Sequence, residues 1–235
     1  MSYKRNKMIV MPSSNTGFEC GRLFGAFPHR MAHLFGCEEL RNPPARYAID
    51  NGIFGATVGK RDWTPEPFFG MLETVAQKVK PMWVVVPDAM GDKDETLRRW
   101  DKYADTCRLF EMTLAFAAQD GMTPDDVPDG AEVVFIGGST EWKWRHLTEF
   151  TAAFPRVHVG RVNTYRLLWM ADRAGAESCD GTGWFRGDQN QIAGLWRYLN
   201  ESESNGQPQQ NFDDALFAEV QSSTDQCPTI GESAA

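Results

Sequence analysis

Short apolar runs recur along the chain, and each ends in small or polar residues. Runs such as WVVV, VVFI and TLAFAA are continuous rather than alternating between apolar and polar positions, which is typical of parallel strands buried on both faces. The seven runs that we predict as strands cover residues 7–11, 46–49, 82–86, 113–118, 132–136, 157–159 and 176–179. An eighth strand is predicted either in degenerate form near Trp184 and Phe185 or not at all.

The segments between these runs repeat their apolar residues at the three- and four-residue spacing of amphipathic helices. These stripes consist of Phe68, Leu72, Val75 and Val79; of Leu97, Trp100, Ala104 and Cys107; of Trp144, Leu147 and Thr151; and of apolar positions within 165–174. Acids at 92, 94 and 95 suit the N-terminus of the second helix. The alternation of strands and helices over 200 residues predicts a parallel α/β fold.

Two parallel architectures are compatible with this alternation. A doubly wound sheet usually carries a glycine-rich phosphate loop, and neither GxGxxG nor GxxxxGK[ST] occurs here. A TIM-like barrel instead places polar residues at the C-terminal ends of many strands. Such residues follow five of the predicted strands: Asp50-Asn51-Gly52, Asp88, Gln119-Asp120-Gly121, Gly137-Gly138-Ser139 and Asp180-Gly181. We therefore predict a TIM-like (β/α)8 barrel in residues 1–200, with one strand degenerate or missing.

The charge of the chain is unevenly distributed. With 24 Lys and Arg against 32 Asp and Glu, the formal net charge of −8 argues against a protein that coats nucleic acid. However, residues 201–235 contain seven acids and no Lys or Arg, so residues 1–200 are nearly neutral. We predict that 201–235 form a flexible acidic tail, in which 212–220 could form a short helix that docks on a protein partner.

The N-terminal apolar run at 8–11 is too short for the core of a signal peptide, and no stretch approaches the length of a membrane span. Five cysteines are scattered without a CxxC pair, so we expect no disulfide framework, a cytoplasmic location and no membrane partner. If the chain is encoded by a phage, this is the cytoplasm of the host cell.

One group of residues has the composition of a zinc site. Cys20, His29, His33 and Cys37 lie close in sequence, and the two histidines are four residues apart. Zinc accepts these ligand types, but the spacing matches no common structural site. Ordinary loop and helix positions are the simpler interpretation, so we predict no metal site.

Three carboxylates, Asp50, Asp88 and Asp180, each close a predicted strand, where an acid would face the mouth of a barrel. Each alone could equally cap the following helix. Together with a Gln and a Gly-Gly pair at equivalent positions they favour a functional mouth. Paired carboxylates can act as nucleophile and proton carrier at an anomeric carbon, and amides can bind the edge of a heterocycle. This set fits N-glycosidic exchange better than redox or phosphoryl chemistry.

These residues resemble the tRNA-guanine transglycosylases, and more closely their shorter branch, which places deazapurines in DNA and is common in phages and genomic islands. The resemblance runs in order from about Tyr47 to Gly187. Six segments carry it: AIDNGIF at 48–54, which looks like the family's DSGGFQ with Asn-Gly in place of Ser-Gly, VPD at 86–88, QDG at 119–121, FIGGS at 135–139, HVG at 158–160 and SCDGT at 178–182. No single segment is specific, but six in the family's order are.

The resemblance implies roles for individual residues. Asp180 would be the nucleophile that forms a covalent glycosyl intermediate, and Asp50 the general acid and base. The residues implied to bind the exchanged base are Asp88, Gln119, Gly137, Gly138, Asn51 and His158, although a buried core position is the simpler interpretation of His158. The implied reaction exchanges guanine in a nucleic acid for a free 7-deazaguanine base and needs no metal or organic cofactor.

One departure from the family concerns the polymer. The tRNA enzymes carry a CxCxxC…H zinc site near the C-terminus, and nothing like it follows Asp180. We therefore expect DNA rather than tRNA as partner, single-stranded or with the target base flipped out. Phosphates would meet cationic side chains around the mouth, which we predict to be Arg161, Arg186, Lys60, Arg61 and Lys143, unless these are ordinary solvated charges.

Several alternatives remain open at the level of sequence. Phe54, Trp184 and Phe185 could stack on a purine or belong to the core, and packing is the expected role of Cys179. The same residues could serve a glycosidase that releases a base from tRNA or DNA to water. A barrel that binds nucleic acid or protein without catalysis is the alternative from a different class.

Overall fold

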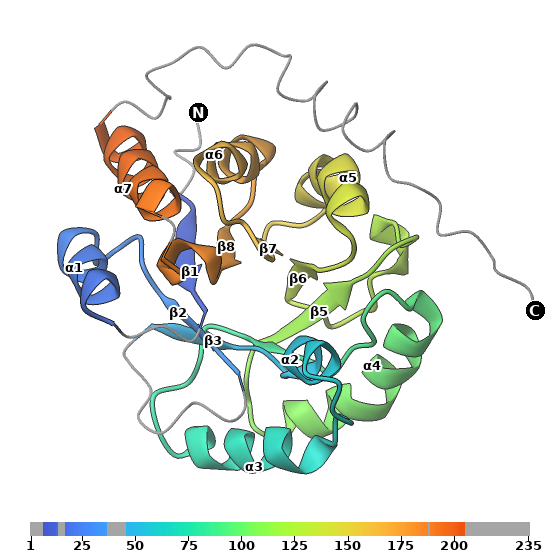
Figure 1. Cartoon of the computed structure of the whole chain (residues 1–235). Coiled ribbons are helices and arrows are strands. Elements are labelled where there is room, and N and C mark those ends of the chain that lie inside the picture. Colours follow the sequence, from blue (N-terminus) through green and yellow to red (C-terminus); the bar gives the residue numbers. More distant parts are fainter. Residues whose placement is uncertain (1–6, 14–16, 37–45, 188, 205–235) are drawn as a thin grey trace, which may run out of the picture.

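The strands of the protein follow one another around a nearly closed barrel, as the computed structural model shows for residues 7–13, 17–36, 46–187 and 189–204 (Figure 1). The strands are β1 (Ile9–Pro12), β2 (His33–Phe35), β3 (Tyr47–Ile49), β4 (Val84–Val85), β5 (Leu114–Ala118), β6 (Val133–Ile136), β7 (Val157–Val159) and β8 (Ser178–Gly181). Neighbours pair in parallel in the order β1-β8-β7-β6-β5-β4-β3-β2. The prediction of a TIM-like (β/α)8 barrel is confirmed.

Helices surround the strands, and all but the short helix at Ile53–Val58, which lies at the C-terminal ends of the strands, cover the outside of the barrel (Figure 1). They are α1 (Phe18–Ala26), α2 (Ile53–Val58), α3 (Pro65–Ala76), α4 (Lys93–Arg108), α5 (Thr140–Ala153), α6 (Tyr165–Ala174) and α7 (Gln189–Ser204), with short 3-10 turns η1 (Pro124–Asp126) and η2 (Gly183–Phe185). The predicted stripes are confirmed except at Val79, which lies beyond α3 and is exposed. Asp92 caps α4, since its Oδ1 accepts the backbone N–H of Glu95 at 2.9 Å. In the described part of the chain, none of the helices has the length and apolar character needed to cross a membrane.

The continuous apolar runs form strands that are buried on both faces. On β5, Phe116 points outward and packs edge-on against Trp100 of α4, with ring centroids 5.5 Å apart. Ala115 and Ala117 alternate with it and join the separate cluster of the barrel interior, which Trp83 also fills. Small side chains on some strands thus leave room for a large ring from another, because successive side chains of a strand point to opposite faces.

The eighth strand lies at a different place from the predicted one. Trp184 and Phe185 form the turn η2, whereas β2 pairs with β3 through His33 opposite Tyr47. The prediction for residues 184–185 is therefore wrong. The strand β2 is as long as β3 and β7, so its length does not explain why it was missed. The sequence prediction treated His33 as an ordinary loop or helix position, which excluded the apolar residues beside it from the set of strands.

The barrel has one seam, between β1 and β2. Instead of a regular ladder, the backbone N–H of Val10 donates to the carbonyl of Arg30 at 2.8 Å, and the N–H of Ala32 donates back to Val10 at 3.2 Å. Two isolated bridges, at Val10 with Met31 and at Ser13 with Leu34, mark the same boundary. The seam is therefore bridged at points rather than sealed.

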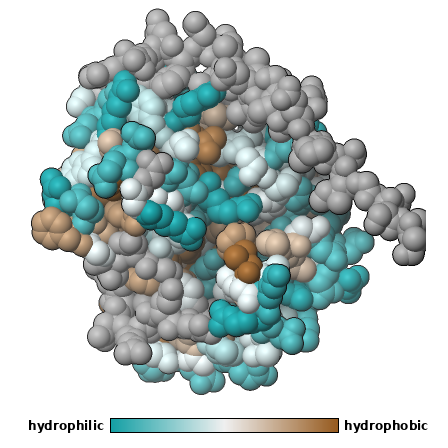
Figure 2. Space-filling view, in the orientation of Figure 1, coloured by the Kyte–Doolittle hydropathy of each residue, from teal (hydrophilic) through white to brown (hydrophobic). Residues whose placement is uncertain are grey.

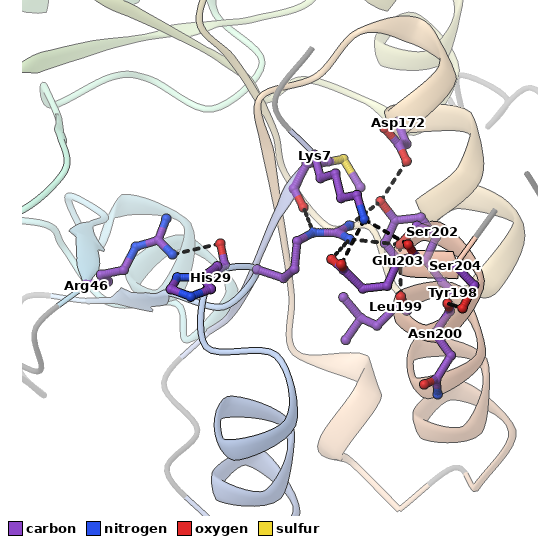
Figure 3. A network of polar contacts seen from close by, with 12 residues as sticks. Lys7, His29, Arg46, Asp172, Tyr198, Leu199, Asn200, Ser202, Glu203 and Ser204 are labelled. Atoms are coloured by element: carbon purple, nitrogen blue, oxygen red, sulfur yellow. Dashed lines mark hydrogen bonds and ion pairs between the residues drawn. The ribbon is translucent and has the colours of Figure 1, made fainter. Parts of the chain in front are cut away.

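A buried arginine reinforces this seam. Figure 3 labels three of its partners, Tyr198, Ser202 and Glu203. The Arg30 guanidinium donates to the Met8 carbonyl, the Ser202 hydroxyl and the Glu203 carboxylate, each at 2.9 Å, and to the Tyr198 hydroxyl at 3.2 Å. It thereby ties β1 and the segment before β2 to the C-terminal half of α7.

The C-terminal boundary of the barrel domain follows from these contacts. The helix α7 continues to Ser204, and both Glu201 and Ser202 are buried. Residues 201–204, which we had assigned to the acidic tail, therefore belong to the folded body. The rest of the tail, with the helix expected at 212–220, lies outside the described residues.

Replacing Arg30 with methionine should lower the free energy of unfolding by about 2–4 kcal/mol, because buried carbonyl and hydroxyl groups would lose their donor. Urea unfolding measures this effect. The control is Arg98→Met on α4, where the arginine pairs with Glu95 at an exposed position and the expected change is below about 1 kcal/mol. Equal losses in both variants would show that the Arg30 contacts do not stabilise the fold.

Candidate active site

The C-terminal ends of the strands surround a cavity of about 500 Å³. Figure 2 shows the molecule in the orientation of Figure 1. Near the centre of this face, hydrophilic residues lie next to hydrophobic ones. The predicted site residues that line the cavity are Asp50, Asn51, Asp88, Gln119, Gly137, Gly138, Asp180, Arg61, Arg161 and Arg186. The fold thus brings residues from six loops and strand ends to one place, as expected where parallel strands end at the same mouth.

Asp180 is a buried carboxylate on β8 that points into the barrel, while its neighbour Cys179 packs outward against the helices. Its Oδ1 accepts the backbone N–H of Arg161 at 3.1 Å and lies 3.2 Å from Nε2 of His158, and its Oδ2 accepts the Ser13 hydroxyl at 2.9 Å. Burial alone would raise its pKa, but the hydrogen bonds and electrostatic interaction with His158 outweigh burial and hold the pKa of Asp180 below its ordinary value. The carboxylate is therefore ionised at neutral pH.

The pKa of Asp50 is shifted in the opposite direction from that of Asp180. Asp50 follows β3 directly, and its Oδ1 accepts the N–H of Gly52 at 3.2 Å. Burial raises the pKa of Asp50 to about 7, and the nearby charges of Asp88 and Asp180 act in the same direction, against the Gly52 hydrogen bond. One cavity thus holds an ionised carboxylate and a carboxyl group that can gain or lose a proton near neutral pH, which is the arrangement that acid–base chemistry requires.

Asp88 is held between two amides. The Asn51 side chain donates to Asp88 Oδ1 at 2.8 Å, and the Gln119 side chain donates to Oδ2 at 2.6 Å. The Gln119 oxygen in turn accepts the N–H of Gly138 at 3.3 Å. Burial raises the pKa of Asp88 despite these bonds. The network thus holds the Asp88 carboxylate, which is a hydrogen-bond acceptor, beside the Gln119 amide group, which is a donor, at the edge of the cavity.

The two positions after β6 require glycine because atoms of neighbouring side chains lie close to them. Gly138 has a positive φ of 55°, and a Cβ there would lie 2.5 Å from Cε3 of Trp142 and 2.8 Å from Oδ2 of Asp120. A Cβ on Gly137 would lie 3.0 Å from Nε2 of Gln119. Only glycine therefore fits this turn without moving the Asp88 network.

Cationic side chains partly surround the cavity as predicted. Arg161, Arg61 and Arg186 are exposed and line it, whereas Lys60 is exposed but lies outside the lining. The Arg161 guanidinium donates to the Gly138 carbonyl and lies 5.3 Å from the ring centroid of Phe54. Three positive charges thus lie at the rim, where they would attract an anionic ligand.

Two of the predicted contact residues lie beneath the site instead. Lys143 is buried, donates its Nζ to the Gly160 carbonyl and cannot reach a phosphate at the rim, so its predicted role is wrong. His158 is fully buried, with Nδ1 2.8 Å from the Ser178 hydroxyl, and it contacts Asp180 rather than the cavity. Since the Asp180 carboxylate can only accept, Nε2 of His158 carries the proton in that contact.

The three aromatic residues considered for base contact lie in different surroundings. Phe54 lines the cavity and is 44% exposed, so its ring is available for stacking. Trp184 is buried in the core, and Phe185 packs against that core. The core interpretation therefore holds for the latter two, and Phe54 is the candidate for base contact.

Sequence reasoning missed three contacts. Ser13, which follows β1, bonds Asp180, and its place at a strand end was an available signal. The Trp63 indole donates to the Asn51 carbonyl at 2.9 Å and supports that loop. The Arg161 backbone N–H has no signature in the sequence, because any residue carries this group.

Of the four possible zinc ligands, the three that the structure describes lie in different surroundings. His29 is exposed, whereas Cys20 is buried and His33 stacks on Phe24 with ring centroids 4.3 Å apart. Cys37 lies outside the described residues. Among the residues that the structure describes, no three His, Cys, Asp or Glu side chains are grouped so as to hold a metal ion.

Neither a scan against protein-family models nor a search of curated proteins finds a match for this chain. The resemblance to the transglycosylases therefore rests on the six ordered segments alone.

Proposed function

We propose that the protein is a guanine transglycosylase that exchanges guanine in DNA for a 7-deazaguanine base through a covalent intermediate on Asp180. The observation that best supports this is the pair of carboxylates in one cavity, with the pKa of Asp180 lowered and that of Asp50 raised to about 7. A nucleophile must be ionised, while a general acid and base must exchange a proton near neutral pH.

The reaction balances with these two groups. A carboxylate oxygen of Asp180 forms a bond to C1′ of the deoxyribose as the bond from C1′ to N9 of guanine breaks, and Asp50 gives its proton to the departing purine. After guanine leaves and the second base enters, Asp50 removes the proton from N9 of that base. N9 then attacks C1′ and releases Asp180, so that both carboxyl groups return to their starting states.

The Asp88 network suits the edge that both bases share. Guanine and 7-deazaguanine each present two donors, at N1 and N2, beside the acceptor O6. Asp88 has free lone pairs for the donors, and the Gln119 amide has a second N–H for O6. Because the two bases differ at position 7 rather than on this edge, one cavity can hold each in turn.

The cavity accommodates a base outside the helical stack. Its volume of about 500 Å³ suits a single base and sugar rather than a stacked duplex. Exposed Phe54 can stack on the base, while Arg61, Arg161 and Arg186 can contact the flanking phosphates. This geometry supports a single-stranded or flipped target.

Mass spectrometry of nucleosides tests the proposal. Single-stranded DNA, duplex DNA and tRNA are each incubated with the protein and a ¹⁵N-labelled 7-deazaguanine base, then digested. We expect label in the DNA nucleosides and one free guanine released per base incorporated, faster in single strands than in duplexes because the target is already unstacked.

Other results would lead to other functions. Guanine release without incorporation indicates an N-glycosidase, and label in tRNA alone contradicts DNA as the substrate. Binding of all polymers without release, incorporation or adduct contradicts catalysis and leaves a binding protein.

A further inference from the structure

A buried lysine lies directly behind the proposed nucleophile. Lys143 on α5 is 1% exposed, and its Nζ donates to the Gly160 carbonyl. That carbonyl belongs to the same peptide group as the N–H of Arg161, which donates to Asp180 Oδ1 at 3.1 Å. An ammonium group and a carboxylate are therefore joined through the two ends of a single peptide unit.

The peptide unit is confined on all sides. Arg161 has a φ of 61°, in the left-handed region that residues with a side chain rarely adopt. A Cβ on Gly160 would lie 3.0 Å from Cε1 of Phe135 and 3.4 Å from Asp180 Oδ1. The Arg161 side chain reaches across to the Gly138 carbonyl. A strained backbone persists where its surroundings hold it, and the Lys143 hydrogen bond is one such contact.

We propose that Lys143 is a positioning residue for base exchange, whose ammonium group polarises the Gly160–Arg161 peptide and so orients and stabilises the Asp180 carboxylate. A cation at the carbonyl end makes the N–H a stronger donor, since linked hydrogen bonds polarise one another in a buried site. The proposal rests on the function of Asp180 as nucleophile.

The groups that surround this pair decide its pH dependence. Asp180 is faced by His158 of β7, Ser13 after β1 and Asp50 after β3, besides Lys143. Burial lowers the pKa of Lys143 to about 8; the charge of Arg161 acts in the same direction and that of Asp180 against it. Lys143 is thus charged below about pH 8 and loses its effect on the peptide above that value.

The burial of Lys143 favours this role over simple packing. An aliphatic side chain could fill the space beneath the peptide without the cost of burying a charge. The ammonium group gains from its location through the Gly160 carbonyl, the negative charge of Asp180 and the Trp144 ring, whose centroid lies 5.8 Å from Nζ, whereas Arg161 repels it.

NMR of the unmodified protein tests the linkage without any substrate. The ¹⁵N–¹H signal of the Arg161 amide should change with an apparent pKa near 8, following the charge on Lys143. This measurement does not depend on catalysis, so it remains informative if the protein exchanges no base. An Arg161 amide that shows no titration between pH 7 and 9 would overturn the proposal.

The matched variants are Lys143→Met and Lys80→Met, the latter removing an exposed lysine that pairs with Glu111. In Lys143→Met, the ¹³C signal of the Asp180 carboxyl should titrate at a higher pH than in the unmodified protein. The acid limb of adduct formation should move with it, so that the pH at which the rate falls to half rises by about one unit with little change in KM. Lys80→Met should change none of these values. A folded Lys143→Met protein with an unchanged Asp180 titration would contradict the proposal.

Discussion

Replacing Asp180 with asparagine should abolish the covalent adduct between the protein and DNA and lower the rate of base exchange by at least about 10⁴-fold. The amide has nearly the shape of the carboxylate. Its single oxygen can keep the contact of Oδ1 with the Arg161 N–H, while its NH2 group, in the place of Oδ2, can donate to the Ser13 hydroxyl. It lacks the negative charge and the nucleophilicity needed at C1′. Denaturing electrophoresis with end-labelled single-stranded DNA measures the adduct directly.

The control for this variant is Asp92→Asn. Asp92 is also a carboxylate beyond a strand end, but it caps α4 through the N–H of Glu95 and does not line the cavity. Asparagine is an equally good N-cap residue, so adduct formation should stay within about two-fold. If Asp180→Asn formed the adduct at the normal rate, the nucleophile would have to be sought elsewhere, with Asp50, Asp62 and Asp88 as the other carboxylates that line the cavity.

The strand ends were predictable because two simple regularities coincide. Continuous apolar runs marked buried parallel strands, and the fold places the C-terminal end of each at one mouth. Asp50, Asp88, Gln119 and Asp180 could therefore be assigned to one cavity without knowledge of any long-range contact. The strand β2 was not predicted although it is as long as β3 and β7, because His33 had been assigned to a loop or helix; its pairing with β3 is imposed by closure of the barrel.

Whether an individual side chain lies at the rim of the cavity or is buried beneath it could not be predicted in the same way. Lys143 follows the Gly-Gly turn closely in sequence, which suggested the rim. The helix that Ser139 caps instead turns it inward, where it meets a carbonyl 17 residues away. The Ser13 contact with Asp180 joins residues 167 positions apart. Such contacts depend on how the helices and loops pack, which the local pattern does not encode.

Asp50 should give the two halves of the reaction opposite pH dependences. Because its pKa is about 7, Asp50 is protonated below that pH and can supply the proton that departing guanine needs. Adduct formation should therefore slow as the pH rises through about 7. Transfer from the adduct to an incoming base needs ionised Asp50 and should accelerate over the same range. Single-turnover rates for each half, measured between pH 5.5 and 8.5, test this.

The variant Asp50→Asn should slow both halves by about 10²–10⁴-fold and remove the change near pH 7 from each. Its stability provides the control. A raised pKa in the folded state means that the contribution of Asp50 to stability is present at low pH and lost as the pH rises through about 7. Asp50→Asn should therefore be at least as stable as the unmodified protein at pH 8, so its lost activity cannot come from unfolding. Retention of the pH dependence near 7 in both halves would assign the proton transfer to another group, and Asp88, whose pKa is also raised by burial, would be the first to test.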